Sequence, residues 1–534
     1  MSSIIATRAR ARSVFVIGTL AAGLLAIPAA HAQLTDLTQT PNVENSGIAK
    51  SLAQQIGAGV GDVNTPNSSI FIIKRDPARS IRRGRQLFQR KFTVAQGFGP
   101  RTFDGIGDIA REASIGAGLV DSCAGCHGRP RGSAGFGGDV VTRPDSRDAP
   151  HLFGLGLQEQ LADEITTDLR NIRAGAIADA QRFRQTITRT LVSKGINYGT
   201  IRAFPSGNVD TSGVDGVDTD LRVRPFFAQG GTISIREFLV GAFNAEMGVE
   251  AVDPLLASAA SGGRVVTPSG MVLDGRLDRI EAPPASSTGQ DPDGDGVTNE
   301  LPTALVDHME FYLLNYFKPG LYRQTPLTQQ GLAIFNQIGC GSCHVQNLTI
   351  NRDRRVADVE TVYDPLKGIF NTMFATASLR LVEQNDGSGF PTLKTPALQS
   401  FVVRNFFADL KRHDLGPKFH ERNFDGTMQT EFMTEPLWGV GSSPPYGHDG
   451  RSVNLREVIL RHGGEAQGPR NAFAGLSENS KAAIFEFLNS LVLFPPDDTA
   501  SNLDPGNPAT VGFPQRGHGS IRLGALFNDP NEGE

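Results

Sequence analysis

The sequence is poor in cysteine and tryptophan, with four cysteines and one tryptophan in 534 residues. It also lacks a charge excess, because the net charge is only -5 and no lysine/arginine cluster follows a helix face. A nucleic-acid-binding protein would carry a basic patch or stripe, so we do not expect this protein to bind nucleic acid. A hydrophobic content of 39% in a chain of this length predicts a globular protein with about two or three packed units.

Long hydrophobic runs are missing beyond the N-terminus, so no membrane span is expected. Three arginines in residues 8–12 precede the apolar segment 14–26, which is shorter than the roughly 20 residues that a membrane span needs. Small residues at both ends of the Ala-His-Ala triplet 30–32 match what a signal peptidase reads. Residues 1–32 are therefore predicted to be a cleavable signal peptide, and the mature protein is expected in the periplasm.

All four cysteines fall in two C-x-x-C-H motifs, at residues 123–127 and 340–344. In such a motif the two thiols bind the vinyl groups of one haem, and the adjacent histidine ligates its iron. Two disulfides or redox-active dithiols are the alternatives for an exported protein, whereas zinc would need further ligands at finger spacing. The motifs predict two covalently bound haem c groups held by Cys123, Cys126, Cys340 and Cys343, with His127 and His344 as proximal iron ligands.

The wide separation of the two motifs predicts two separate haem domains. A Gly-x-x-x-Phe pattern precedes each motif, at residues 84–88 and 331–335, and in c-type cytochromes such a helix packs against the C-terminal helix of its domain. Ser477 followed by apolar residues at helical spacing predicts the closing helix of the second domain. Further helices are expected around residues 158–195 and 234–247. The expected fold is mainly α, with two cytochrome c-like haem domains, long loops and small β excursions.

The predicted domain order follows from these features. It comprises a signal peptide (1–32), an N-terminal arm (33–80), a first haem domain (81–285), a linker (286–324), a second haem domain (325–497) and a C-terminal tail (498–534).

The segments Pro-Leu-Trp-Gly-Val (436–440) and Pro-Tyr-Gly-His-Asp-Gly-Arg (445–451) resemble the bacterial di-haem cytochrome c peroxidase superfamily. The closer resemblance, through residues 149–157, 409–416 and 462–466, is to its di-haem oxidoreductase branch of peroxidases and thiol oxidoreductases. It implies that a small redox protein or other donor reduces the C-terminal haem. Electrons would then pass to the N-terminal haem, where peroxide or another oxidant reacts.

Two other functions share this general plan and stay open. One is a pure electron-transfer cytochrome with two six-coordinate irons. The other is an oxygenase of the latex-cleaving kind, which would bind O2 at the first haem.

The resemblance also implies a sixth ligand for the second haem. In the family a Met or Tyr binds this iron fourteen residues after the histidine of the His-Asp-Gly motif, and here His462 stands fourteen residues after His448. His462 is therefore predicted to complete a bis-histidine site, with His413 as the alternative ligand. Because methionine ligation raises the haem potential, this haem should have a lower potential than its Met-ligated relatives.

The first haem is predicted to be the reactive one, because its surroundings lack a comparable ligand signal. Peroxide chemistry needs an acid/base group beside the iron. His151, as ligand or base, and Glu159 are the candidates, although a satisfied polar residue is the simpler interpretation of each. Trp438, the single tryptophan, is a candidate electron relay between the haems or a ring that covers a haem edge.

A cation site is predicted between the two haem domains. Asp291, Asp293 and Asp295 alternate around a glycine turn and Glu300 follows, which partly matches a calcium-binding loop. A plain acidic turn is the alternative. Calcium is therefore expected as a further cofactor.

Overall fold

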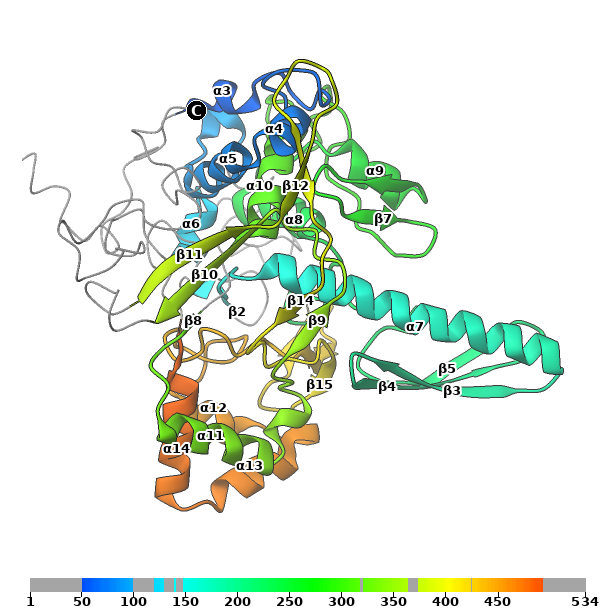
Figure 1. Cartoon of the computed structure of the whole chain (residues 1–534), viewed down its shortest axis with the longest axis vertical. Helices are drawn as coiled ribbons and strands as arrows, with labels where there is room; N and C mark the ends of the chain where they lie inside the picture. Colours follow the sequence, from blue (N-terminus) through cyan, green and yellow to red (C-terminus); the bar gives the residue numbers. More distant parts are fainter. Residues whose placement is uncertain are drawn as a thin grey trace, which may run out of the picture. The chain divides into compact units, whose positions relative to one another are not determined.

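The computed structural model describes residues 50–98, 120–128, 139–140, 147–316, 320–363, 373–423 and 425–492. The predicted signal peptide and C-terminal tail lie outside these residues. All described residues belong to one unit, Gly47–Glu534, which is drawn in Figure 1.

The helices of the described residues alternate with short strands along the chain. The helices are α3 (Leu52–Ile56), α4 (Ser69–Arg75), α5 (Pro77–Gln89), η2 (Val94–Gln96), α6 (Cys123–His127), α7 (Leu155–Phe183), α8 (Ile235–Met247), α9 (Pro254–Ala260), α10 (Thr303–Asn315), α11 (Pro326–Gln337), η3 (Cys340–Ser342), α12 (Leu455–Arg461), η4 (Gly464–Ala466), α13 (Gln467–Ala474) and α14 (Glu478–Asn489).

The strands pair into two-stranded antiparallel sheets, some of which join strands far apart in sequence such as β8 and β19, and one three-stranded sheet, β3-β4-β5. They are β1 (Asp139–Val140), β2 (Arg147–Asp148), β3 (Ile187–Ser193), β4 (Ile196–Ala203), β5 (Val209–Val214), β6 (Arg264–Val266), β7 (Val272–Asp274), β8 (Gly320–Leu321), β9 (Leu348–Ile350), β10 (Ala357–Tyr363), β11 (Met373–Leu379), β12 (Leu381–Gln384), β13 (Leu393–Pro396), β14 (Phe401–Val403), β15 (Arg412–Asp414), β16 (Glu421–Arg422), β17 (Met428–Gln429), β18 (Glu431–Met433) and β19 (Leu491–Val492).

The expectation of a mainly α fold is wrong, because strands make up 19% of the structure beside 37% helix. The predicted helix 158–195 shows the reason. Helix α7 ends at Phe183, where Arg184 adopts a left-handed conformation, and the threonines and valine of β3 continue the chain as a strand. Their β-branched side chains favour a pleated surface. On β4 the buried residues Ile196, Tyr198, Ile201 and Ala203 pack with α7, beside which the sheet lies in Figure 1.

Each Gly-x-x-x-Phe helix packs closely on a later helix. For the second copy this is α14, the predicted closing helix, whereas the partner of the first copy, α10, lies in the segment 286–324 that was predicted to be a linker. A Cβ on Gly84 of α5 would lie 2.2 Å from His308 O of α10, and one on Gly331 of α11 would lie 2.0 Å from Ala483 O of α14. Only glycine permits each close approach. Both crossings carry an aromatic pair, Phe88–Tyr312 at 6.2 Å and Phe335–Phe487 at 5.5 Å between ring centroids. Helix α10 is therefore the packing partner of α5, as α14 is the packing partner of α11.

The core consists of three hydrophobic clusters that correspond to these elements. The first joins α5, α8 and α10, the second joins α7 to β3, β4 and Trp438, and the third joins α11 to α14. Helix α8 and α14 confirm the helices expected near residues 234–247 and after Ser477, whose hydroxyl accepts a hydrogen bond from Ser480 N. None of the helices in the described ranges is long and apolar enough to cross a bilayer.

Candidate haem sites

Each C-x-x-C-H motif holds its histidine through a hydrogen bond to a backbone carbonyl. Nδ1 of His127 lies 2.7 Å from Pro150 O, and Nδ1 of His344 lies 2.9 Å from Phe407 O. A carbonyl can only accept, so Nδ1 donates in both rings and Nε2 keeps its lone pair. Metal-ligating histidines use the same arrangement, which fixes both the tautomer and the ring orientation. The two predicted proximal ligands are therefore prepared to bind iron.

None of the four cysteines forms a disulfide, and Cys123, Cys126 and Cys340 lie in surroundings that suppress ionisation of the thiol. Burial raises the pKa of Cys123 and of Cys126 to about 12, and that of Cys340 to about 11. A redox-active dithiol needs a lowered thiol pKa, so these surroundings oppose that alternative. The negative charge of Glu246, on α8, also raises the pKa of Cys126 and places this carboxylate within electrostatic reach of the first motif.

His462 has the same hydrogen-bond arrangement as the two proximal histidines. It caps the C-terminus of α12, where its Nδ1 donates to Val458 O at 2.7 Å and its ring meets Phe419 edge-on. Burial and, to a smaller extent, the repulsion from a protonated His462 lower the pKa of His344 to about 4, so the two rings lie within electrostatic reach. The structure thus brings a second neutral histidine, with its Nε2 lone pair available, to the second motif.

His413 is held differently. Its Nδ1 lies 2.7 Å from Glu465 Oε2 and its Nε2 lies 2.9 Å from Asp409 Oδ2. Burial lowers the pKa of His413, but the hydrogen bond to Asp409 and the other contacts outweigh burial and raise it to about 11. A ring that donates from both nitrogens offers iron no lone pair. The geometry therefore favours His462 over His413 as the sixth ligand.

Neither nitrogen of His151 faces an open site. Its Nε2 donates to Trp438 O at 2.9 Å, and its Nδ1 accepts from Phe153 N at 3.2 Å. Burial lowers the pKa of His151 to about 4, which keeps the ring neutral. The ring of His151 connects the backbone next to Pro150, whose carbonyl holds His127, to the segment that carries Trp438. A ring held on both nitrogens in this way is not placed to act as a distal base.

The indole of Trp438 is buried between the two halves of the site. It packs edge-to-face on Phe406 at 5.1 Å, and a Cβ on Gly154 would lie 2.6 Å from its ring. Its Nε1 is buried and has no hydrogen-bond partner among the described residues. A buried donor without a partner costs about 1–3 kcal/mol, so an acceptor such as a haem propionate suits this position.

Glu159 connects three segments of the fold through its carboxylate. It is buried on α7, where Oε2 accepts from Ile235 N at 2.6 Å and Oε1 pairs with the Arg354 guanidinium. These interactions join α7 to the start of α8 and to the segment after β9. A proton-transfer role would have to break this ion pair.

The predicted calcium loop has the geometry of a cation site. Carboxylate oxygens of Asp291, Asp293 and Asp295 lie within 4.8 Å of one another, as do those of Glu250, Asp293 and Glu300. Glu300 is 4% exposed, and its Oε1 has no hydrogen-bond partner in the described part of the chain. Burial, together with the charges of Asp293, Glu250 and Asp295, raises the pKa of Glu300 to about 8. A bound cation would relieve this repulsion, and a shell of hard oxygens suits calcium.

Sequence reasoning missed Glu250 and the two carbonyls that orient the proximal histidines. Glu250 follows α8, far from the acidic loop in sequence, and no spacing rule connects the two. Pro150 O and Phe407 O are backbone atoms, which carry no residue-type signal.

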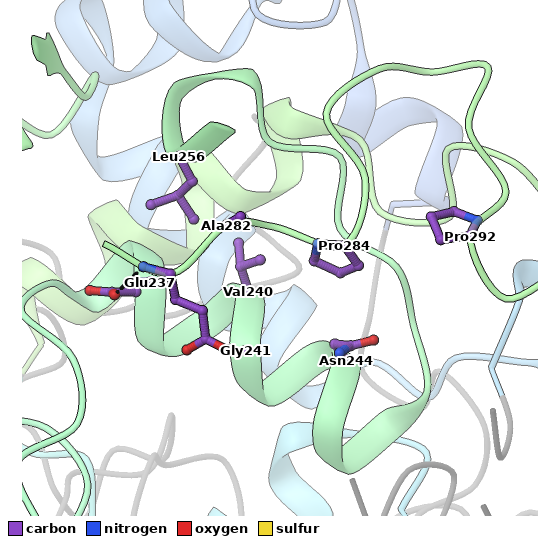
Figure 2. A pocket seen from close by; sticks show the side chains of 9 residues that line it. Glu237, Val240, Gly241, Asn244, Leu256, Ala282, Pro284 and Pro292 are labelled. Carbon is purple, nitrogen blue, oxygen red and sulfur yellow. Dashed lines mark hydrogen bonds between the residues drawn. The ribbon is translucent and has the colours of Figure 1, made fainter. Parts of the chain in front are cut away.

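A cavity of about 190 Å³ lies on one side of α8, and Figure 2 shows its lining. Glu237, Val240, Gly241 and Asn244 of α8 face Pro284 across it. Glu237 accepts hydrogen bonds from Ile233 N and Glu281 N. The cavity is smaller than the ~300–1,000 Å³ of typical ligand pockets, and it holds none of the predicted haem residues.

Residues 368–491 match the family model described as "Di-haem oxidoreductase, putative peroxidase". The match confirms the resemblance to the di-haem oxidoreductase branch, and it indicates that the chain binds haem. It includes Trp438 and His462 but neither C-x-x-C-H motif.

The comparisons with individual proteins are less informative. No curated protein matches the chain significantly. Among solved structures, a hydrazine synthase from Kuenenia stuttgartiensis, pressurised with xenon, aligns with a TM-score of 0.21 and 16% identity. The alignment covers 35% of this chain and 55% of that one, so the chain spans about half of that protein.

Proposed function

We propose that this chain is an exported, periplasmic di-haem c-type oxidoreductase of the peroxidase type. The observation that carries the proposal is the common orientation of His127, His344 and His462. Each donates from Nδ1 to a backbone carbonyl and leaves Nε2 for iron. Two of these histidines complete C-x-x-C-H motifs, whose four thiols form no disulfide, as thioether attachment requires.

The second site is proposed as the place where electrons enter. His344 and His462 supply two neutral imidazoles, held in place by Phe407 O and Val458 O. Two strong-field nitrogen ligands keep the iron six-coordinate and low-spin, so this site exchanges electrons without binding substrate. A small redox protein or another electron donor would reduce it.

The first site is proposed as the place of reaction. His127 supplies the proximal ligand, while His151 is held by Trp438 O and Phe153 N and Glu159 by Arg354 and Ile235 N. As they are held, neither of these two residues would offer a ligand to a haem bound at His127. When bound there, haem supplies the redox chemistry by which two electrons and two protons convert hydrogen peroxide to two water molecules.

Low-temperature EPR of the purified holoprotein tests the proposal, before and after addition of one electron per molecule. A high-spin signal from the first haem in either state, beside a low-spin signal from the second, is expected. Two low-spin signals that survive reduction and ignore added peroxide would leave only the electron-transfer cytochrome. A stable complex of the reduced protein with O2 would instead favour the oxygenase.

We further propose that calcium occupies the cluster of Glu250, Asp293 and Glu300, with Asp291 and Asp295 completing the shell. The cluster adjoins the chain that leads to the first motif, because a Cβ on Gly97 would lie 2.1 Å from Glu300 Oε1. A cation here would therefore stabilise the contact between Glu300 and the backbone at Gly97.

Calcium at 100 times its dissociation constant is expected to stabilise the holoprotein by about 2.7 kcal/mol, since it binds the folded state alone. Thermal unfolding after chelation and after calcium addition measures this shift. Glu300→Gln should lose most of the calcium response, whereas Asp425→Asn, which alters an exposed turn carboxylate, should retain it. An unchanged melting temperature in the unmodified protein would contradict the calcium assignment.

A further inference from the structure

The two proximal histidines are the ends of one unbroken chain of covalent and hydrogen bonds. From the first end, His127 Nδ1 donates to Pro150 O at 2.7 Å, and Pro150 is bonded to His151. His151 Nε2 then donates to Trp438 O at 2.9 Å. The ring of His151 thus joins the proximal loop of the first site to the backbone of the Trp438 segment.

The second half of the chain runs along the backbone to the other site. Leu437, bonded to Trp438, donates its N–H to Phe406 O at 3.2 Å. Phe406 is bonded to Phe407, whose carbonyl accepts from His344 Nδ1 at 2.9 Å. No step in the chain crosses empty space. Electron tunnelling decays more slowly through covalent and hydrogen bonds than through a gap, so such a path couples its ends.

We propose that the electron passing between the two sites follows this path, with His151 as the positioning residue that joins its halves. The inference rests on the proposed di-haem function and specifies the route of electron transfer between the two haems. One electron leaves the reduced iron at His344, which is oxidised, and reduces the oxidised iron at His127. No proton moves, because both Nδ1–H groups and the Nε2–H of His151 stay on their nitrogens.

In this path Trp438 takes part through its backbone and not as an aromatic electron relay. Its backbone carbonyl is the connecting atom, whereas its indole packs on Phe406 and against Gly154. Trp438 is buried and His151 is half-buried, which limits the access of water to the hydrogen bond between them. The route therefore depends on a donor at His151 Nε2 and tolerates a change of the indole.

Laser-flash reduction of the oxidised holoprotein, with absorbance followed at both haems, measures the transfer rate. His151→Phe keeps a ring but removes the donor. The inter-haem rate should fall at least about tenfold, equivalent to ~1.4 kcal/mol of activation free energy, while both midpoint potentials stay unchanged. His151→Gln, whose amide can donate to Trp438 O, should restore much of the rate.

Trp438→Phe provides the second test, because it keeps the carbonyl and replaces the indole by a smaller ring. Because this variant also lacks the Nε1 donor, both haem potentials are measured beside the rate. At equal driving force its inter-haem rate should stay close to that of the unmodified protein. A large fall in this variant, or an unchanged rate in His151→Phe, would overturn the inference and leave the proposed function intact. If the unmodified protein shows no inter-haem transfer, the inference and the proposed function both fail.

Discussion

Replacing His462 with methionine is expected to raise the midpoint potential of the second haem by on the order of 0.1–0.3 V, a part of the ~0.8 V range that axial ligands control. Thioether ligation favours the reduced iron more than imidazole does. The substitution site supports this change, because His462 lies at the end of α12 with its ring against Phe419. Spectroelectrochemical titration of the holoprotein measures the potential of each haem.

His413→Gln is the matched control for this prediction. His413 is bound by Asp409 and Glu465 on both nitrogens, so its replacement should leave the ligation of the second haem unchanged. A high-spin second haem in His413→Gln, together with an unshifted potential in His462→Met, would assign the sixth ligand to His413. The first haem, ligated by His127, should keep its potential in both variants.

The candidate haem ligands could be named from the sequence because each C-x-x-C-H motif places two thiols and an imidazole at fixed spacing in contiguous residues. The glycine of each Gly-x-x-x-Phe helix likewise marks a close helix crossing. His462 was named as a candidate through its distance from the His-Asp-Gly motif. These features are local, so one sequence suffices to read them.

The β content and the roles of His151 and Glu159 depend on distant partners. The strands β10 and β11 pair with each other although no tight turn joins them in the sequence, and β15 pairs with β18 across a long connection. Glu159 is engaged by Arg354, and His151 by the carbonyl of Trp438, at sequence separations of 195 and 287 residues. Residue type alone suggested catalysis for both, because tertiary contacts determine whether a polar group is already satisfied.

Replacing Arg236 with methionine is expected to destabilise the protein by about 3–5 kcal/mol, because it leaves buried carboxylates without their cation. Arg236 of α8 is fully buried and pairs with Asp253 at 2.6 Å, Asp307 at 2.9 Å and Glu310 at 2.8 Å. This cluster joins α8 to α10, so the loss should also loosen the helix that ends near the first motif. Urea unfolding of the holoprotein, followed by circular dichroism, measures the change.

The loss in Arg236→Met should shrink as the pH falls. Burial raises the pKa of Asp307 and of Glu310, and the charge of Arg236 opposes that rise. Without Arg236 both pKa values rise further in the folded state, so folding favours the protonated carboxyls and stability falls as pH rises through those values. The variant should therefore be closer to the unmodified protein at about pH 5 than at about pH 8. Arg202→Met, which breaks an exposed pair with Asp210, should change little, and an equal loss in both variants would refute the burial argument.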